Sequence, residues 1–277
     1  MTDAGFRLSG FGDEIDPEPA VQLAVLAALG ARAIEVRSAW GVNIVELPGG
    51  RLAELASAVA GAGFETSAIA SPVGKAELGL APDAELRRLD RAIEAAHALG
   101  APFIRVFSFQ HDGSAPEAVR DEVVDRMGAL AARAADAGLV LLLENEIGVY
   151  GDTPQHVLEV LAGVASPALR LAWDAGNFVR AGARPFDDAF ALLRPYLSYL
   201  QVKDALPGEG SVPAGHGDGQ VGETVAALLD SGFAGYASLE PHLAVAGRYG
   251  GFTGPRGFGI AARAFAGVVA QHGGRLS

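Results

Sequence analysis

The chain has 277 residues, half of them hydrophobic, and its 33 acidic and 21 basic residues give a formal net charge of −12. This balance disfavours nucleic acid as a partner, because contacts to a phosphate backbone need a basic surface, whereas it suits the binding of a cation. Cysteine is absent, which excludes disulfides and thiolate metal ligands. The N-terminal MTDAGFRLSG lacks the apolar core of a secretory signal, and no apolar run approaches the roughly 18 residues of a membrane span. We therefore expect a soluble, cytoplasmic protein without a membrane partner.

Short apolar segments, typical of buried strands, alternate with helical segments along the chain. The expected strands, in chain order, are Arg7–Phe11, Ala33–Val36, Glu65–Ala70, Phe103–Phe107, Leu139–Glu146, Leu169–Trp173, Leu197–Val202 and Tyr236–Leu239. The expected helices lie at about 17–29, 50–62, 83–99, 116–137, 153–162, 186–193, 223–230 and 257–271. Proline and glycine mark many of the boundaries. Thr153 and Pro154 fit the N-cap and first position of one helix, and Gly100 follows the end of another.

Eight strand–helix units in this order predict an α/β fold, a single (β/α)8 TIM barrel that covers residues 1–277 as one domain. An open, doubly wound sheet is the main structural alternative. No GxGxxG motif follows the first strand, which weakens a dinucleotide-binding version of that alternative. The sequence shows no linker that would divide the chain.

Acidic and amide residues follow four consecutive strands of the expected barrel. The segment LVLLLENE, Leu139 to Glu146, is an apolar run that ends abruptly in carboxylates. The polar residues at the strand ends are Glu35, Lys75, Arg105, Glu144, Asp174, Gln201 and Glu240. The last four are separated by 30, 27 and 39 residues, each about one strand–helix unit. Because active sites of such barrels lie at the carboxyl ends of the strands, these four side chains are expected to meet in one mouth.

Three carboxylates in one apolar mouth would repel each other at neutral pH unless a cation lies between them. Oxygen ligands without cysteine favour one divalent ion, Mg²⁺ or Mn²⁺. The alternative interpretation is that these acids belong to unrelated, solvent-exposed loops.

The chain resembles the xylose-isomerase-like barrels of sugar isomerases and epimerases along essentially its whole length. Four segments carry the resemblance: LLLENE, AWDAGN, YLQVKDA and ASLEPH. The resemblance implies that Glu144, Asp174, Gln201 and Glu240 ligate the metal, with Zn²⁺ or Co²⁺ as further candidates. The family commonly has histidine where this chain has Gln201, and relatives similar to hydroxypyruvate isomerases have glutamine there. An amide oxygen is a harder ligand than imidazole, which lowers the expected affinity for Zn²⁺.

The resemblance also implies a reaction, the isomerisation or epimerisation of a small sugar, sugar phosphate or hydroxy-ketone through a metal-stabilised enediolate. Such a reaction needs a base next to the carbonyl and a means to stabilise the enediolate oxygen. By the resemblance, Glu144 and Glu240 exchange the proton as the acid/base pair. The expected partner is a carbohydrate-like small molecule, and the barrel is a candidate homo-oligomer.

Further residues are candidates for substrate binding. Lys75 and Arg105 either bind an anionic group or neutralise the acids of the mouth, and Glu35 either binds substrate hydroxyls or pairs with Arg37. Asn177 stands where many ketose epimerases have a substrate-contacting histidine, and Glu146 also stands where histidine is frequent. We expect Lys203 to support the metal ligands through hydrogen bonds. The full set of candidates is Glu35, Lys75, Arg105, Asn177, Lys203 and His216.

Three alternative functions would each require different features of the site or the product. A lyase similar to inosose or dehydroshikimate dehydratases would use the same metal site and release an unsaturated product. An abasic-site endonuclease similar to endonuclease IV would need a histidine-rich zinc cluster and a basic groove, which the sequence disfavours. A catalytically silent binding barrel is disfavoured because buried acids without a cation are costly.

Overall fold

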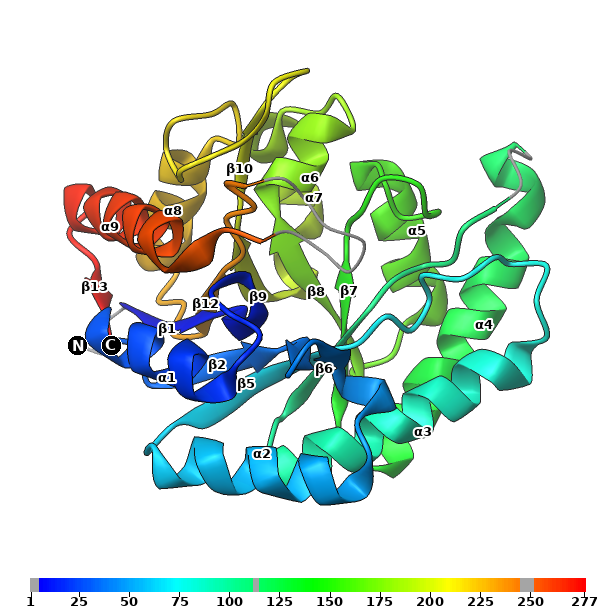
Figure 1. The fold of residues 1–277 in the computed structure, drawn as a ribbon. Helices are drawn as coiled ribbons and strands as arrows, with labels where there is room; N and C mark the ends of the chain where they lie inside the picture. Colours follow the sequence, from blue (N-terminus) through cyan, green and yellow to red (C-terminus); the bar gives the residue numbers. More distant parts are fainter. Residues whose placement is uncertain (1–4, 112–114, 245–251) are drawn as a thin grey trace.

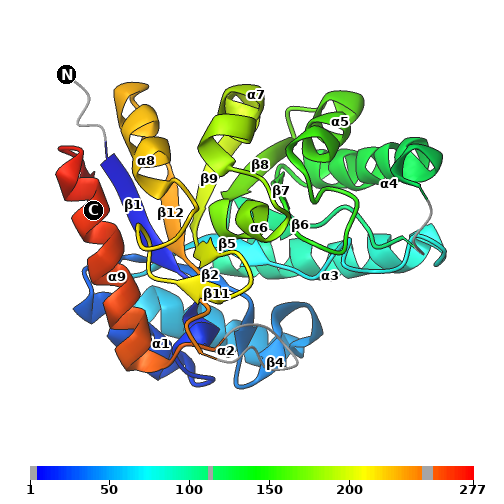
Figure 2. The same cartoon turned by 90° about the horizontal axis from the view of Figure 1, so that it is seen from above.

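A curved parallel sheet forms the centre of the structure, and helices cover its outside (Figures 1 and 2). The computed structural model describes residues 5–111, 115–244 and 252–277. The strands of the large sheet are β1 (Gly5–Gly10), β2 (Ala33–Val36), β5 (Glu65–Ala70), β6 (Phe103–Val106), β7 (Val140–Glu144), β8 (Leu169–Asp174), β9 (Leu197–Val202), β12 (Tyr236–Leu239) and β13 (Arg275–Leu276). The α-helices are α1 (Pro19–Ala28), α2 (Gly49–Gly61), α3 (Pro82–Leu99), α4 (Pro116–Asp136), α5 (Pro154–Val164), α6 (Ala175–Arg180), α7 (Ala191–Leu193), α8 (Val221–Asp230) and α9 (Gly254–Gln271). Short 3₁₀ turns cover Gly12–Glu14, Ile44–Glu46 and Arg194–Tyr196.

The strands lie side by side in chain order, as a barrel requires. The order of neighbours is β2, β5, β6, β7, β8, β9, β12 and β1, all parallel, and β13 pairs with the beginning of β1. A parallel bridge between Phe11 and Glu35 brings the end of β1 beside β2 and closes the ring. The predicted TIM barrel is confirmed.

Six of the strands have both an outward and an inward apolar face. Leu141 and Leu143 of β7 belong to the large core between sheet and helices, whereas Leu142 belongs to a separate cluster inside the barrel. That interior cluster takes one buried residue from each of six strands: Ala33, Ala68, Leu142, Ala172, Tyr199 and Tyr236. Because side chains alternate along a strand, a residue two positions after a cluster member also points inward, nearer the carboxyl end of the barrel.

Several predicted helix boundaries are confirmed. Thr153 caps α5 by accepting a hydrogen bond from the N–H of His156 (3.3 Å), and Gly100 ends α3 in the left-handed conformation, with φ at 65°. The segment expected as a helix over 186–193 is a π-helix, Pro185–Phe190, followed by α7. Among the described residues, no helix combines the length and the hydropathy of a membrane span.

Three further elements lie at the carboxyl ends of strands and were not predicted. They are α6 after β8, the hairpin of β3 (Ser38–Ala39) with β4 (Val42–Asn43), and the hairpin of β10 (Asp204–Leu206) with β11 (Gly210–Val212). All are short, so their sequences show too few residues for a clear periodicity. They surround the end of the barrel at which the predicted site residues gather.

Candidate active site and metal centre

Four oxygen-bearing side chains meet at the carboxyl end of the barrel. Glu144 ends β7, Asp174 ends β8, Gln201 lies near the end of β9, and Glu240 directly follows β12. All four are buried, and one carboxylate oxygen from each acid lies within 4.8 Å of the other two. The alternation along the strands explains this convergence, because each of the four side chains lies two or four positions after a member of the interior cluster.

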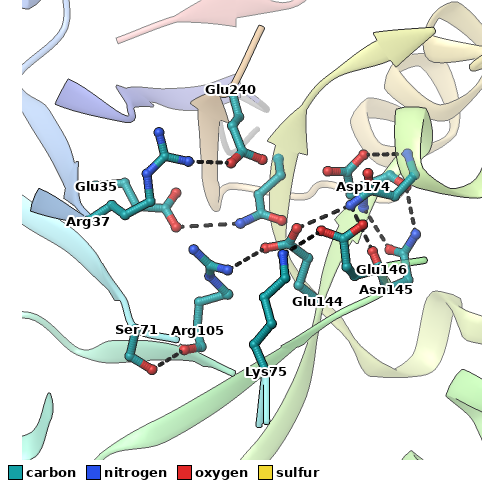
Figure 3. Close-up of polar contacts among 12 residues, drawn as sticks. Glu35, Arg37, Ser71, Lys75, Arg105, Glu144, Asn145, Glu146, Asp174 and Glu240 are labelled. Carbon is teal, nitrogen blue, oxygen red and sulfur yellow. Dashed lines mark hydrogen bonds and ion pairs between the residues drawn. The ribbon is translucent and has the colours of Figure 1, made fainter. Parts of the chain in front are cut away.

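Two buried cations contact Asp174 and Glu240. Lys203, one residue beyond β9, places Nζ 2.7 Å from Asp174 Oδ2 and 2.8 Å from Glu240 Oε2. Arg37, one residue beyond β2, places Nη1 3.1 Å from Glu240 Oε1 (Figure 3). Its Nε lies 2.8 Å from Asp13 Oδ2. Burial would raise the pKa of Glu240, but Lys203, and then His242 and Arg37, outweigh it and hold that pKa well below its usual range. Glu240 is therefore a stable carboxylate in this arrangement.

Arg105 makes the corresponding contact to Glu144 from β6. Its Nη1 lies 3.3 Å from Glu144 Oε2, and its guanidinium carbon lies 4.3 Å from the centre of the Phe107 ring. The aromatic face and the carboxylate together hold the arginine side chain in one orientation. Burial raises the pKa of Glu144, Arg105 opposes that effect, and the charge of Glu240 adds to it. Glu144 and Glu240 thus differ in proton affinity.

Asn177 and Asn145 form a hydrogen-bonded frame beneath two of the acids. Asn177 Nδ2 donates to Glu144 Oε1 (3.2 Å) and to the carbonyl oxygen of Asn145 (3.0 Å), while the N–H of Asn177 donates to Asp174 Oδ1 (2.8 Å). Asn145 exchanges two hydrogen bonds with the backbone of Asp174. Asn177, a predicted substrate-binding residue, is fully buried, and its side chain donates to the metal-ligand candidate Glu144. These contacts fit a positioning role.

The oxygens that face the cluster leave capacity for a cation. Among the described residues, Glu144 Oε2, Gln201 Oε1 and Glu240 Oε2 are buried and have no hydrogen-bond donor of good geometry. Gln201 turns its Nε2 toward Glu35 Oε1 (3.5 Å), which leaves its oxygen as the free group. Burial raises the pKa of Asp174 to about 7, although Lys203 acts against this. The buried oxygen of Gln201 and three buried acids with oxygens within 4.8 Å of one another form a donor set that fits a hard divalent cation, although Arg105 and Lys203 already contact Glu144 and Glu240.

Glu35 lies beside this set and shares a polar layer with it. The hydroxyl of Tyr199 donates to Glu35 Oε2 (2.9 Å), and the same hydroxyl lies 2.8 Å from that of Ser67. Burial raises the pKa of Glu35 to about 7, while a hydrogen bond from Ser238 and the charge of Arg105 oppose the shift. Glu35 can therefore exist in either protonation state near neutral pH.

A cavity of about 260 Å³ leads from this set to the surface. Lys75 lies at its mouth with 43% of its side chain exposed, 3.0 Å from Glu146 Oε2 and 4.6 Å from the centre of the Phe107 ring. Arg105, Lys203 and other predicted residues line the same cavity. Its lining consists of Arg37, Asn43, Ala70, Pro72, Lys75, Arg105, Phe107, Glu144, Glu146, Lys203, Glu240 and His242. The structure thus brings Lys75, Arg105 and Lys203 together with the acids, as predicted from their places at strand ends.

Glu14, His242 and Glu240 form a second, adjoining group of potential metal ligands. His242 Nε2 lies 3.1 Å from Glu14 Oε1 and 3.3 Å from Glu240 Oε1. Glu14 Oε2 accepts hydrogen bonds from the N–H of His242 (3.0 Å) and from the hydroxyl of Thr253. Burial, followed by the charge of Glu240, raises the pKa of Glu14 to about 8. Glu14 therefore ties the loop after β12 to the loop after β1.

His216 lies away from these groups, in a hollow lined by residues of α8 and α9. Its loop is held by Asp204, whose carboxylate accepts hydrogen bonds from the N–H groups of Gly215 (2.8 Å), Gly217 (3.0 Å) and Gly219 (2.8 Å). Gly217 and Gly219 leave room for the carboxylate, and His216 is exposed. The predicted contact of His216 with substrate would require a substrate that reaches this hollow.

Three groups at the site were not singled out from the sequence. Arg37 and Asp13 form an ion pair at the end of β1 and β2, and Glu14 follows them in the acidic loop GDEID. A strand-end rule that extends to the fourth residue beyond each strand would have found all three. The fold and these contacts together define a (β/α)8 barrel with an oxygen-ligand cluster at its carboxyl end.

Comparisons with known proteins name the family. The family model of the xylose isomerase-like TIM barrel matches residues 23–253. The chain is 30% identical over 226 residues to the 2-epi-5-epi-valiolone 7-phosphate 2-epimerase of an Actinoplanes species, a match that covers 74% of this chain and 80% of the relative. The chain therefore belongs to the xylose isomerase-like TIM barrel family.

Two solved structures show the same fold. A D-tagatose 3-epimerase-like protein has a TM-score of 0.78 at 15% identity, over 97% of this chain and 98% of that chain. A xylose isomerase-like TIM barrel protein from Mycobacterium smegmatis, solved in complex with magnesium, has a TM-score of 0.70 at 20% identity, over 95% of each chain.

Proposed function

We propose that this protein is a divalent-metal-dependent isomerase or epimerase of a small sugar, sugar phosphate or hydroxy-ketone. The observation that carries the proposal is the cluster of Glu144, Asp174 and Glu240, with oxygens within 4.8 Å of one another beside the free oxygen of Gln201. The name of the Actinoplanes relative, an epimerase that acts on a 7-phosphate, supports the reaction class.

Glu144, Asp174, Gln201 and Glu240 would hold the metal. An all-oxygen set favours Mg²⁺ or Mn²⁺ over Zn²⁺ or Co²⁺, and the magnesium in the Mycobacterium smegmatis structure supports this choice. When bound, the cation supplies a Lewis acid that stabilises negative charge on a substrate oxygen. Asn177 and Asn145 keep Glu144 and Asp174 in fixed orientations, which reduces the rearrangement needed for binding.

Glu144 and Glu240 would move the proton at the substrate carbon. In the metal-free protein, their surroundings push their pKa values apart, upward for Glu144 and downward for Glu240. A pair with unequal proton affinities can start with one member as the acid and the other as the base. Arg37 and Lys203 keep Glu240 ionised, and Arg105 limits the cost of ionising Glu144 when the roles exchange.

The cavity is suited to a small polar substrate. Its volume of about 260 Å³ is below the range of about 300–1,000 Å³ typical of pockets for drug-sized ligands. Lys75 at the mouth is the cation best placed to contact an anionic group on the distal end of a substrate, because its side chain is partly exposed. Phe107 offers an apolar face beside it.

The test is exchange of substrate hydrogen with solvent. Wild-type protein saturated with Mn²⁺ is incubated in D₂O with a panel of ketoses, ketose phosphates and hydroxy-ketones, and deuterium incorporation is followed by NMR. Glu240→Gln, saturated with Mn²⁺ and shown to bind it, should exchange at least about 10²-fold more slowly, the lower end of a general acid–base contribution. Unchanged turnover in that variant would refute the acid/base assignment. An unsaturated product, detected by ultraviolet absorbance, would favour the lyase instead.

A further inference from the structure

We propose that Lys203 is a tethered counter-ion of the metal centre: its ammonium holds Asp174 and Glu240 in place before a divalent cation binds and then competes with that cation for the same two oxygens. The inference rests on the proposed function, since it concerns the affinity of the proposed metal centre. It predicts that the protein binds its metal more weakly than the four oxygen ligands alone would.

The ammonium of Lys203 occupies the metal-facing oxygens of two ligands. Asp174 Oδ1 accepts the N–H of Asn177 (2.8 Å), so Oδ2, 2.7 Å from Lys203 Nζ, is the oxygen left for a metal. Glu240 Oε1 lies 3.1 Å from Arg37, and Oε2 lies 2.8 Å from Lys203 Nζ. A cation that binds both acids through these oxygens must therefore share them with the lysine or displace it.

The backbone around Gly176 holds the Lys203 side chain beside Asp174 and Glu240. A Cβ on Gly176 would come 2.8 Å from Cγ of Lys203 and 3.1 Å from its Cδ, so the glycine of the AWDAGN segment provides the space for the lysine stem. The N–H of Gly176 also donates to the carbonyl oxygen of Lys203 (3.1 Å), which links α6 to the end of β9. Lys203 is 3% exposed, and its Nζ has a third neighbour in Asn177 Oδ1 at 3.5 Å. This is a fixed internal ion pair rather than a surface contact.

The charge of Lys203 has opposite effects in the two states of the site. Without a metal, it offsets the repulsion between Asp174 and Glu240, which are both buried. With a divalent ion bound to the same oxygens, it places a third positive charge at close range in a poorly screened interior. Removing the charge should thus destabilise the metal-free protein and strengthen metal binding.

Lys75 provides a matched control for this effect. It carries the same charge and lines the same cavity, but its Nζ contacts Glu146, which is not one of the four proposed ligands. Competition for ligand oxygens would affect only Lys203, whereas Lys75→Met tests whether loss of a lysine charge from the cavity lining is by itself enough to strengthen metal binding.

The experiment measures Mn²⁺ affinity by isothermal titration calorimetry, with free Mn²⁺ checked by electron paramagnetic resonance, for wild type, Lys203→Met and Lys75→Met. We expect Lys203→Met to bind Mn²⁺ at least about tenfold more tightly than wild type, because close charges interact strongly at an effective dielectric constant of about 20, and Lys75→Met to stay within about threefold. Metal-free Lys203→Met should melt at a lower temperature than wild type. Should it not fold, Lys203→Gln, which keeps an N–H donor for Asp174, is measured in the same way.

The outcomes separate this inference from the proposed function. Equal or weaker Mn²⁺ binding by the folded Lys203 variant would overturn the inference and leave the metal centre intact. Binding by that variant but not by wild type would support the inference and contradict the metal-dependent function. Absence of binding in both proteins would overturn both.

Discussion

Replacing Asn177 by alanine should destabilise the protein, because it removes two buried hydrogen bonds that the Asn177 side chain donates. The side chain is fully buried, and its Nδ2 donates to Glu144 Oε1 at 3.2 Å and to the carbonyl oxygen of Asn145 at 3.0 Å. A hydrogen bond to a charged acceptor contributes about 1.5–3 kcal/mol and one to a neutral acceptor about 0.5–1.5 kcal/mol, so the two losses together cost about 2–4.5 kcal/mol. The cost persists because both acceptors remain buried and unpaired in the variant.

The assay is equilibrium unfolding in urea, with EDTA present so that metal binding does not contribute. Asn43→Ala is the control, because the Asn43 side chain accepts a single hydrogen bond, from the N–H of Val45 at 3.2 Å, and is only half-buried. It should lose about 1 kcal/mol, the usual cost of removing such a cap. Equal losses in the two variants, with unchanged m-values, would refute the positioning role of Asn177.

Two other predictions concern pH and the loop after β9. Glu14 and Asp174 have pKa values raised to about 8 and about 7 from ordinary values of 4.5 and 3.8, so the folded, metal-free protein binds protons that the unfolded chain has released. The stability that these two carboxyl groups contribute is fully present below about pH 4 and is lost as the pH rises through 7 to 8. The melting temperature in EDTA should therefore fall from about pH 5 to about pH 8; a rise over that interval would contradict the shifts. Gly217→Ala should lose more than about 2 kcal/mol in urea unfolding, because its Cβ would come 2.5 Å from the carbonyl oxygen of Ala205. Gly222→Ala within α8 should change stability by less than about 1 kcal/mol, since its Cβ meets only a histidine nitrogen at 3.3 Å; similar losses in both would show that crowding at Gly217 is not the cause.

Much of the barrel could be predicted because its strands are buried on both faces. The apolar runs Ala33–Val36, Glu65–Ala70, Leu197–Val202 and Tyr236–Leu239 have the predicted bounds. Helix α6 could not be predicted in this way, because its first residues belong to the polar segment AWDAGN. Asp174 caps that helix with the carboxylate that we also propose as a metal ligand, a double role that no periodicity reveals.

The candidate site could be predicted where residues follow strands directly and not where distant loops meet. Glu144, Asp174 and Glu240 converge because each lies at a strand end with inward orientation. The partners of Glu240 follow from closure of the barrel: Arg37 comes from the loop after β2, and His242 is held by Glu14 from the loop after β1. These contacts depend on which strands become neighbours across the closing bridge, and the sequence alone does not specify their distances.

The most direct test of the account is the metal content of the purified protein. Three proteins are compared: wild type, the double variant Glu144→Gln/Glu240→Gln and the control Glu35→Gln. The control changes a carboxylate of the same polar layer that is not one of the four proposed ligands. Each protein is incubated with Mn²⁺, dialysed and analysed by inductively coupled plasma mass spectrometry. We expect one divalent ion per chain in wild type and in Glu35→Gln, and none in the double variant. Wild type without bound metal, even after incubation with excess Mn²⁺, would contradict it.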